Sequence, residues 1–197
     1  MIKLIQKSVI TFLFMFISTI SFAAVTSWQI VPNQSSITFI ASQNNAPVSG
    51  SFNSFNGKIN FDPNQLEKSN VHIVVDMNSI TTSDPDVSNT LKTADWFNAK
   101  LFPQAIFNAS DFTKTGNNSY QANGTLTIRN KSLPIKLMFV LEQYSSTNAV
   151  AKGMVVIKRN EFGVGQGDWA NTDVVKDDVQ VNFQITAVKS QLQLSKQ

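Results

Sequence analysis

The sequence contains no cysteine and a single histidine among its 197 residues. Without cysteine the chain can form no disulfide and no thiolate metal site, so packing alone must stabilise the fold. One histidine is too few for a multi-histidine metal centre or a histidine-based catalytic triad. That residue, His72, lies on the polar phase of an alternating segment, where we expect it to face solvent. We therefore predict no metal site.

Basic residues also form no large cluster, and no run of them is longer than Lys158-Arg159. Nucleic-acid binding needs a concentrated positive face. Two of the 16 basic residues, Lys3 and Lys7, lie close to the N-terminus, so the others nearly balance the 13 acidic residues. The sequence therefore predicts no nucleic-acid partner.

The apolar run near the N-terminus, residues 9–20, is shorter than the roughly 20 residues that a membrane-spanning helix needs. Two lysines precede it and the small residues of 21–23 follow, which is the arrangement of a secretory signal peptide. Polar residues come directly afterwards, which opposes the alternative of a membrane anchor. We expect residues 1–23 to be a cleaved signal peptide and residues 24–197 to form one domain.

The chain is rich in apolar residues at alternate positions, including many of its 15 phenylalanines. This period is typical of strands with one buried face. The segments with this pattern are residues 37–41, 48–52, 55–61, 71–77, 105–109, 120–129, 133–142, 149–158 and 178–188. The phase changes at Asn53-Ser54, which predicts a bend, because a one-residue slip would otherwise turn the apolar face outward.

About eight long strands joined by short turns predict an all-β fold. A two-sheet sandwich and a closed eight-stranded antiparallel barrel share these local patterns, and we favour the barrel. A barrel of this size has an interior able to hold one small ligand.

Residues 81–97 break the strand pattern. Asp84 and Pro85 suit the N-cap and first position of a helix, and Trp96-Phe97 would end it. Its apolar face would contain Val87, Leu91 and Ala94. We predict a short helical insertion that covers one end of the sheet's core.

The sequence of residues 161–177 predicts a long glycine-rich loop. The run that begins at Gly163 resembles a phosphate loop only in glycine content, because no Lys-Ser/Thr pair follows it. No nucleophile or acid–base group occurs elsewhere in a catalytic arrangement, so we do not expect an enzyme.

With metal, nucleic-acid and catalytic sites set aside, the candidate binding surface is the apolar face of the predicted strands, which suits a long hydrocarbon ligand. Each buried CH₂ contributes about 0.8 kcal/mol, so an isoprenoid tail can bind without a charged anchor and without any other cofactor. Inward-facing candidates for the pocket are Phe39, Phe52, Val75, Met77, Phe107, Leu126, Leu137, Phe139 and Phe183. Candidates for the lid and rim are Trp96, Phe97, Phe102, Phe162 and Trp169.

The segment from Leu91 to Phe107 resembles the signature L-x-s-x-D-F/W-F-x-x-x-x-F/Y-P-x-x-x-F of the YceI-like family. Further matches follow in the family's order at residues 28–39, 50–57, 124–128, 158–163 and 178–183. The resemblance implies a secreted, periplasmic, lipocalin-like antiparallel barrel that binds a polyisoprenoid, an isoprenoid quinone or a similar long-chain lipid in its interior.

Residues 163–174 look like a branch of this family that is linked to membrane b-type cytochromes. This leaves a second hypothesis, a non-enzymatic interaction module that docks on such a membrane cytochrome through residues 163–172. A filled barrel core and an exposed Trp169 would favour it. The residues leave open which lipid binds and whether the protein forms a homodimer.

Overall fold

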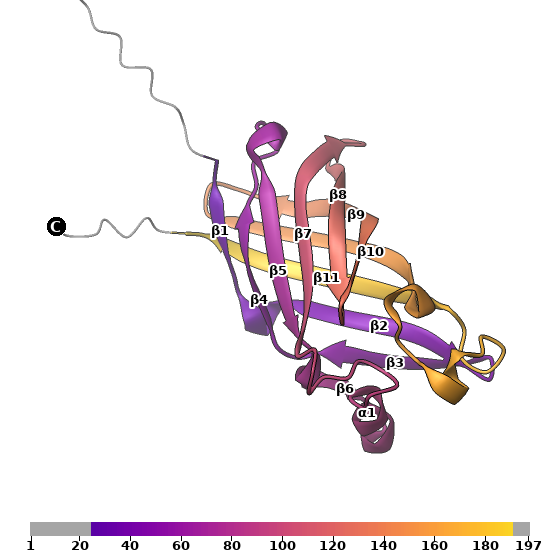
Figure 1. Ribbon diagram of the computed structural model, residues 1–197. Coiled ribbons are helices and arrows are strands. Elements are labelled where there is room, and N and C mark those ends of the chain that lie inside the picture. The colour runs from indigo at the N-terminus through magenta and orange to yellow at the C-terminus, as the bar shows by residue number, and fades with distance from the viewer. Residues whose placement is uncertain (1–24, 191–197) are drawn as a thin grey trace, which may run out of the picture.

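The computed structural model describes residues 25–190, and the predicted signal peptide lies outside this range. A single antiparallel sheet of 11 strands curves around the molecule (Figure 1). Its strands are β1 (Ser27–Ile30), β2 (Ser36–Gln43), β3 (Ala46–Phe52), β4 (Phe55–Asn60), β5 (Asn70–Asp76), β6 (Ile80–Thr82), β7 (Gln104–Lys114), β8 (Ser119–Ile128), β9 (Lys131–Tyr144), β10 (Asn148–Lys158) and β11 (Asp178–Lys189). Within residues 25–190, no helix has the length and hydrophobicity to span a membrane.

Eight of these strands close into a barrel in the order β1-β4-β5-β7-β8-β9-β10-β11. Strand β11 pairs with β10 along one edge. Its other edge is shared, because Gln180 to Gln184 pair with β2 and Ala187 to Lys189 pair with β1. The β1–β11 pairing joins the two ends of the sheet. The predicted eight-stranded antiparallel barrel is therefore confirmed.

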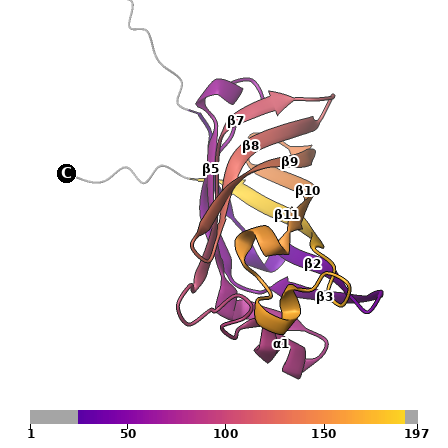
Figure 2. The same cartoon turned by 45° about the vertical axis from the view of Figure 1, so that its right-hand side comes forward.

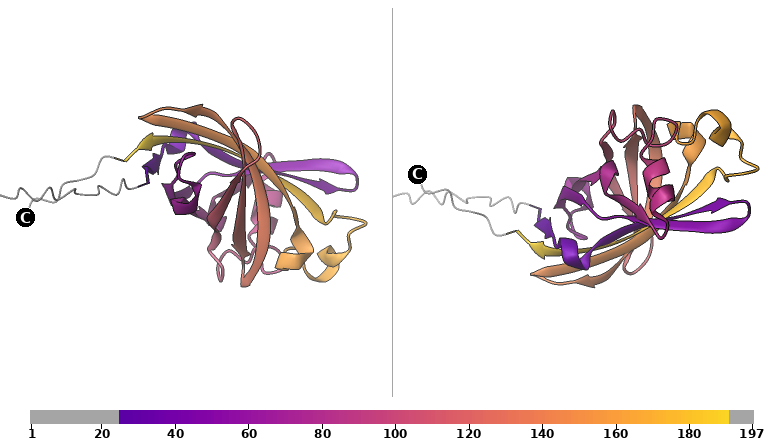
Figure 3. Two further views of the ribbon diagram at one scale, coloured as in Figure 1. Left: turned by 90° about the horizontal axis from the view of Figure 1, so that it is seen from above. Right: turned by 90° about the horizontal axis from the view of Figure 1, so that it is seen from below.

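The remaining strands β2, β3 and β6 extend the sheet beyond the barrel wall, where β2 and β3 project as a ribbon (Figure 3). Strand β3 ends at Phe52 and β4 begins at Phe55, so the predicted bend at Asn53-Ser54 is confirmed. At the tip of the ribbon Asn44 and Asn45 have φ angles of 50° and 61°. Asparagine tolerates this region, which a two-residue hairpin turn requires.

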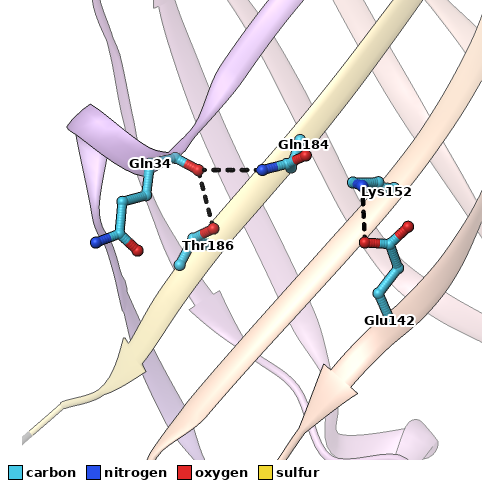
Figure 4. A network of polar contacts seen from close by, with 5 residues as sticks. All are labelled: Gln34, Glu142, Lys152, Gln184 and Thr186. Carbon is cyan, nitrogen blue, oxygen red and sulfur yellow. Dashed lines mark hydrogen bonds and ion pairs between the residues drawn. The ribbon is translucent and has the colours of Figure 1, made fainter.

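Strands β1 and β2 are separated by a 3₁₀ turn, Pro32–Gln34, which is held on the outer face of β11 (Figure 4). The carbonyl oxygen of Gln34 accepts hydrogen bonds from Thr186 Oγ1 at 2.9 Å and from Gln184 Nε2 at 3.4 Å. On the same polar face, Lys152 pairs with Glu142 across β10 and β9 at 2.8 Å. The polar phase of these strands thus faces outward, which leaves the apolar phase inside.

The helix α1 (Pro85–Leu91) begins as predicted, since the carboxylate of Asp84 accepts from the backbone N–H of Asp86. It ends at Leu91, earlier than expected, and Ala94 is exposed. The prediction that Ala94 continues the apolar face is therefore wrong. The chain leaves the helix through a series of turns, in which Phe97 donates its backbone N–H to the Leu91 carbonyl at 3.0 Å.

Gly153 of β10 lies opposite Phe183 of β11, in the phase that faces the barrel interior. A Cβ atom at this position would lie 2.6 Å from Phe183 Cζ and 2.2 Å from the carbonyl oxygen of Met138. Only glycine leaves room for the phenylalanine ring to lie across β10. The glycine therefore sets where one wall of the interior lies.

We expect Gly153→Ala to lower the free energy of unfolding by about 1–3 kcal/mol, because the ring and the neighbouring backbone must both move. Urea denaturation measures this change. The matched control is Gly116→Ala in the β7–β8 turn, where the nearest atom to an added Cβ is Ser119 Cβ at 3.3 Å. We expect a change of about 0.5 kcal/mol or less in the control. Equal unfolding midpoints for the two variants would contradict this account of Gly153.

Candidate functional site

The interior of the barrel contains two apolar cavities of about 210 Å³ and 140 Å³. We call the larger the barrel cavity and the smaller the lid cavity. Four residues line both of them: Ile37, Val75, Leu126 and Val181. These residues come from four different strands, so they form a constriction where the two cavities adjoin. The two apolar cavities therefore lie end to end, with these four side chains between them.

The barrel cavity is bounded by an aromatic cluster. Phe61 packs edge-on against Phe112, Tyr120 and Phe139, with ring centroids 5.4 to 5.7 Å apart. Trp28 joins this cluster and donates its indole N–H to the Phe61 carbonyl at 2.9 Å. Burial raises the pKa of Tyr120, so its hydroxyl is uncharged at neutral pH. This part of the interior therefore carries no charge.

The lid cavity lies beneath α1 and the segment from Arg159 to Asp177, which cover the same end of the barrel (Figure 2). We call residues 159–177 the clamp loop. Its backbone N–H groups at Gly165 and Gln166 donate to the Asp95 carbonyl at 2.8 and 2.7 Å. Arg129 donates to the carbonyls of Trp96 and Gly163. The turns after α1 are thus joined to the clamp loop by backbone and side-chain hydrogen bonds.

Arg159 organises the clamp loop from within. The residue is only 2% exposed, and every N–H of its guanidinium donates. The acceptors are the carbonyls of Val164, Gly165, Trp169, Val175 and Lys176 and the Asn160 side chain, at 2.7 to 3.2 Å. Burial lowers the pKa of Arg159, while the nearby Asp177 carboxylate acts in the opposite direction. All five donors are used, so none is free for a ligand.

Three aromatic side chains meet above the lid cavity. The guanidinium of Arg159 stacks over the Trp96 ring at 5.8 Å, and the Trp96 and Trp169 rings lie 5.4 Å apart. Phe162 is 2% exposed beside them. The lid is therefore an ordered, buried layer, in which the arginine satisfies the carbonyl groups of an irregular segment.

The structure places the predicted pocket residues on the walls of this interior, with two exceptions. Those that line the barrel cavity are Val75, Phe107, Leu126, Leu137, Phe139 and Phe183. Those that line the lid cavity are Phe39, Phe52, Val75, Met77, Trp96, Phe97, Leu126 and Phe162. Trp169 does not line either cavity and instead packs on Trp96, and Phe102 lies against Arg129. That these residues contact a ligand stays a prediction.

Sequence reasoning missed two groups. The aromatic residues Trp28, Phe61 and Phe112 line the barrel cavity, and only their strand phase could have indicated this. Sequence reasoning noted Arg159 only as half of the basic pair Lys158-Arg159 and as part of a family motif, and assigned it no structural role. No local pattern marks a buried arginine, because its acceptors come from a loop whose path depends on the tertiary structure.

The outer wall carries a wide polar groove over β5, β7, β8 and β9. His72 lies in it, exposed as predicted, and its Nδ1 lies 2.6 Å from Asn108 Oδ1. Amide and hydroxyl side chains make up about half of the groove's lining, together with His72, Lys136 and apolar residues. It contains no pairing of a nucleophile with a base, so the apolar interior is the stronger candidate site.

A closed antiparallel barrel with an elongated apolar interior and a covered end defines the class of protein: a barrel built around an internal hydrophobic site. A family model described as YceI-like domain matches residues 28–187. The chain belongs to the YceI-like family.

Known proteins agree with this assignment. The structure of BcnA from Burkholderia cenocepacia is 30% identical, covers 80% of this chain and 98% of that one, and superposes with a TM-score of 0.76. A polyisoprenoid-binding domain from Saccharophagus degradans has 13% identity and a TM-score of 0.68 over 84% of this chain and 99% of that one, which shows a shared fold. A UPF0312 protein of Pectobacterium carotovorum is 32% identical over 88 residues, which is 45% of each chain. The chain therefore matches less than half of that relative's length.

We expect Arg159→Lys to lower the free energy of unfolding by about 2–4 kcal/mol, because lysine cannot reach all the buried carbonyls that the planar guanidinium satisfies. Hydrogen exchange of the amides in residues 163–177 should accelerate more than exchange in the barrel strands. Mass spectrometry of exchanged peptides measures this directly.

The matched control is the neighbouring Lys158→Met, which removes only the exposed ion pair between Lys158 and Asp178. We expect it to leave the urea unfolding midpoint unchanged, because an exposed ion pair contributes little to stability. Unchanged exchange in the clamp loop of Arg159→Lys would show that the guanidinium does not hold this segment.

Proposed function

We propose that the protein is a binding or carrier protein for a long apolar lipid, of the polyisoprenoid or isoprenoid-quinone class, which it holds inside the barrel without catalysing a reaction. We further propose that it acts in the periplasm after removal of residues 1–23.

The apolar interior, with its two adjoining cavities, is the observation that carries this proposal. Apart from Arg159, the residues around the two cavities are aliphatic or aromatic, with Tyr144 as the only other hydroxyl-bearing or charged side chain. Typical ligand pockets occupy about 300–1,000 Å³. Two small cavities joined end to end suit a slender chain better than a compact ligand.

The energetics of such a site favour a hydrocarbon tail. Each CH₂ group that leaves water contributes about 0.8 kcal/mol, so several isoprene units bind tightly through burial alone. The polyisoprenoid-binding domain that shares this fold is consistent with such a ligand. A polar or charged ligand would lose its hydration without gaining partners in the barrel cavity.

The second candidate is an interaction module that docks on a membrane cytochrome through the clamp loop. It predicts a filled interior and an exposed Trp169. Trp169 is half-buried against Trp96, and the interior has two cavities. The geometry therefore favours lipid binding. Docking on a membrane cytochrome is the hypothesis to test if no lipid is found.

Native mass spectrometry of the protein purified from its own secretory compartment, followed by organic extraction, tests the proposal. We expect a stoichiometric apolar ligand whose mass identifies an isoprenoid. The mass of the polypeptide reports on export, since a chain that begins near Ala24 supports cleavage of residues 1–23. An empty protein that also takes up no added polyisoprenoid would refute the carrier function.

We expect Val181→Phe to weaken binding of a long polyprenol at least tenfold, because the larger ring obstructs the constriction between the two cavities. Titration followed by native mass spectrometry measures the bound fraction. A short isoprenoid alcohol that fits within one cavity should lose less affinity. The comparison of long and short ligands separates a blocked passage from a general loss of binding.

Val140→Phe is the matched control, because Val140 is 42% exposed on the outside of β9. It adds the same ring to the same residue type and should leave both affinities unchanged. Equal loss for long and short ligands in Val181→Phe would show that a tail does not pass the constriction.

A further inference from the structure

Trp96, one of the residues that line the lid cavity, carries an unsatisfied buried polar atom. Among residues 25–190, its indole Nε1 is the only buried side-chain nitrogen or oxygen without a hydrogen-bond partner. The side chain is 8% exposed and lines the lid cavity. Buried indole N–H groups ordinarily have an acceptor, as Trp28 does at the Phe61 carbonyl. The unpaired donor at Trp96 therefore needs an explanation.

The surroundings of Trp96 fix the direction of this donor. Its Cζ3 atom lies 3.4 Å from where a Cβ of Gly165 would be. In an indole, Cζ3 is across the six-membered ring from Cε2, the carbon that carries Nε1. The N–H therefore leaves from the ring edge opposite Gly165, away from this part of the clamp loop. Stacking by Arg159 and the bond from Arg129 to the Trp96 carbonyl hold the ring in place.

The protein itself offers no acceptor here. Arg159 is the only other polar side chain that lines the lid cavity, and a guanidinium only donates. A buried water needs two to four polar partners, and this cavity supplies one donor. A charged oxygen would lose its hydration without gaining a donor from Arg159, whose N–H groups are all engaged. The acceptor that fits is a neutral oxygen carried by an apolar molecule.

We propose that Trp96 Nε1–H binds a neutral acceptor oxygen, of the ketone, ether or ester type, at one end of the apolar ligand. The ligand then lies with its polar end under the lid and its tail running through the constriction into the barrel cavity. This site rests on the proposed carrier function and adds the orientation and head-group chemistry of the ligand.

A pair of probes that differ in one oxygen tests the site. Farnesylacetone is an isoprenoid methyl ketone, and its hydrocarbon analogue has a CH₂ group in place of the carbonyl. Displacement of the fluorescent apolar dye N-phenylnaphthylamine from delipidated protein gives the affinity for each. We expect the wild type to prefer the ketone by about three- to tenfold, which is the net effect of one hydrogen bond.

Trp96→Phe removes the N–H donor and keeps an aromatic ring. We expect the ketone preference to fall to about one, because the ratio of the two affinities depends on the N–H donor even if the smaller ring changes both affinities. Trp169→Phe makes the same substitution in the adjacent ring, which lines neither cavity, and should keep the ketone preference. An undiminished preference in Trp96→Phe would overturn the proposed site.

A second measurement needs no variant, so it does not depend on how well Trp96→Phe folds. The chain has three tryptophans, Trp28, Trp96 and Trp169, so a ¹H–¹⁵N spectrum contains three indole N–H signals, which single substitutions assign. Farnesylacetone should move the Trp96 proton downfield, and the hydrocarbon should not. Identical responses to both probes would overturn the site while leaving lipid binding intact. Binding of neither probe would overturn the carrier function together with the site.

Discussion

Closure of the barrel depends on how one edge of β11 is divided. Two strands, β2 and β1, pair with successive parts of this edge, and the short β1 pairing joins the ends of the sheet. The turn between β1 and β2 is held on β11 by the hydrogen bonds that Gln34 accepts and by the bond from the Val31 N–H to the Thr186 carbonyl at 2.8 Å. An open sheet would expose both its edges and its apolar face. Closure hides the apolar face and turns it into an interior.

A closed barrel still has two ends, and this chain uses different chemistry at each cavity. Packed aromatic rings around Phe61 bound the barrel cavity, and their contacts are apolar apart from the Trp28 hydrogen bond. The lid cavity is covered by an irregular segment whose buried carbonyls need donors. Arg159 supplies those donors, so one cation replaces the backbone ladder that a strand would provide. Because every donor of this cation is engaged, it stabilises the lid and leaves no N–H group free for a ligand in the cavity.

The contrast between the apolar barrel cavity and the polar lid explains why a single unpaired donor is informative. The lid brings polar groups close to an apolar space, and within the described residues all the buried side-chain donors and acceptors except Trp96 Nε1 have partners. A carrier needs its interior apolar for the tail and can still discriminate ligands by one hydrogen bond at the end. In a dry environment, one such bond separates molecules of nearly equal size and hydrophobicity.

The sequence by itself determined the strands other than the short β1 and β6, the bend at Asn53-Ser54 and the start of the helix at Asp84. Each has a signature in residues that are close together in the sequence: an alternation of period two, a change of phase, or an N-cap followed by proline. Because alternation also determines which side chains share a face, most wall residues of the interior were predictable, and Phe139 and Phe183 are examples.

The tertiary structure alone decided how the apolar face of the sheet closes into a barrel and which segments cover the end of that barrel. Strand patterns do not state which edges pair, so the shared edge of β11 and the constriction at Val181 lie beyond local reasoning. Ala94 was misplaced because turns after Leu91 redirect the chain toward the clamp loop. Arg159 and Trp96 owe their roles to carbonyls and cavities contributed by residues distant along the chain. Burial and hydrogen-bond satisfaction are properties of the folded surroundings, and the residue type does not encode them.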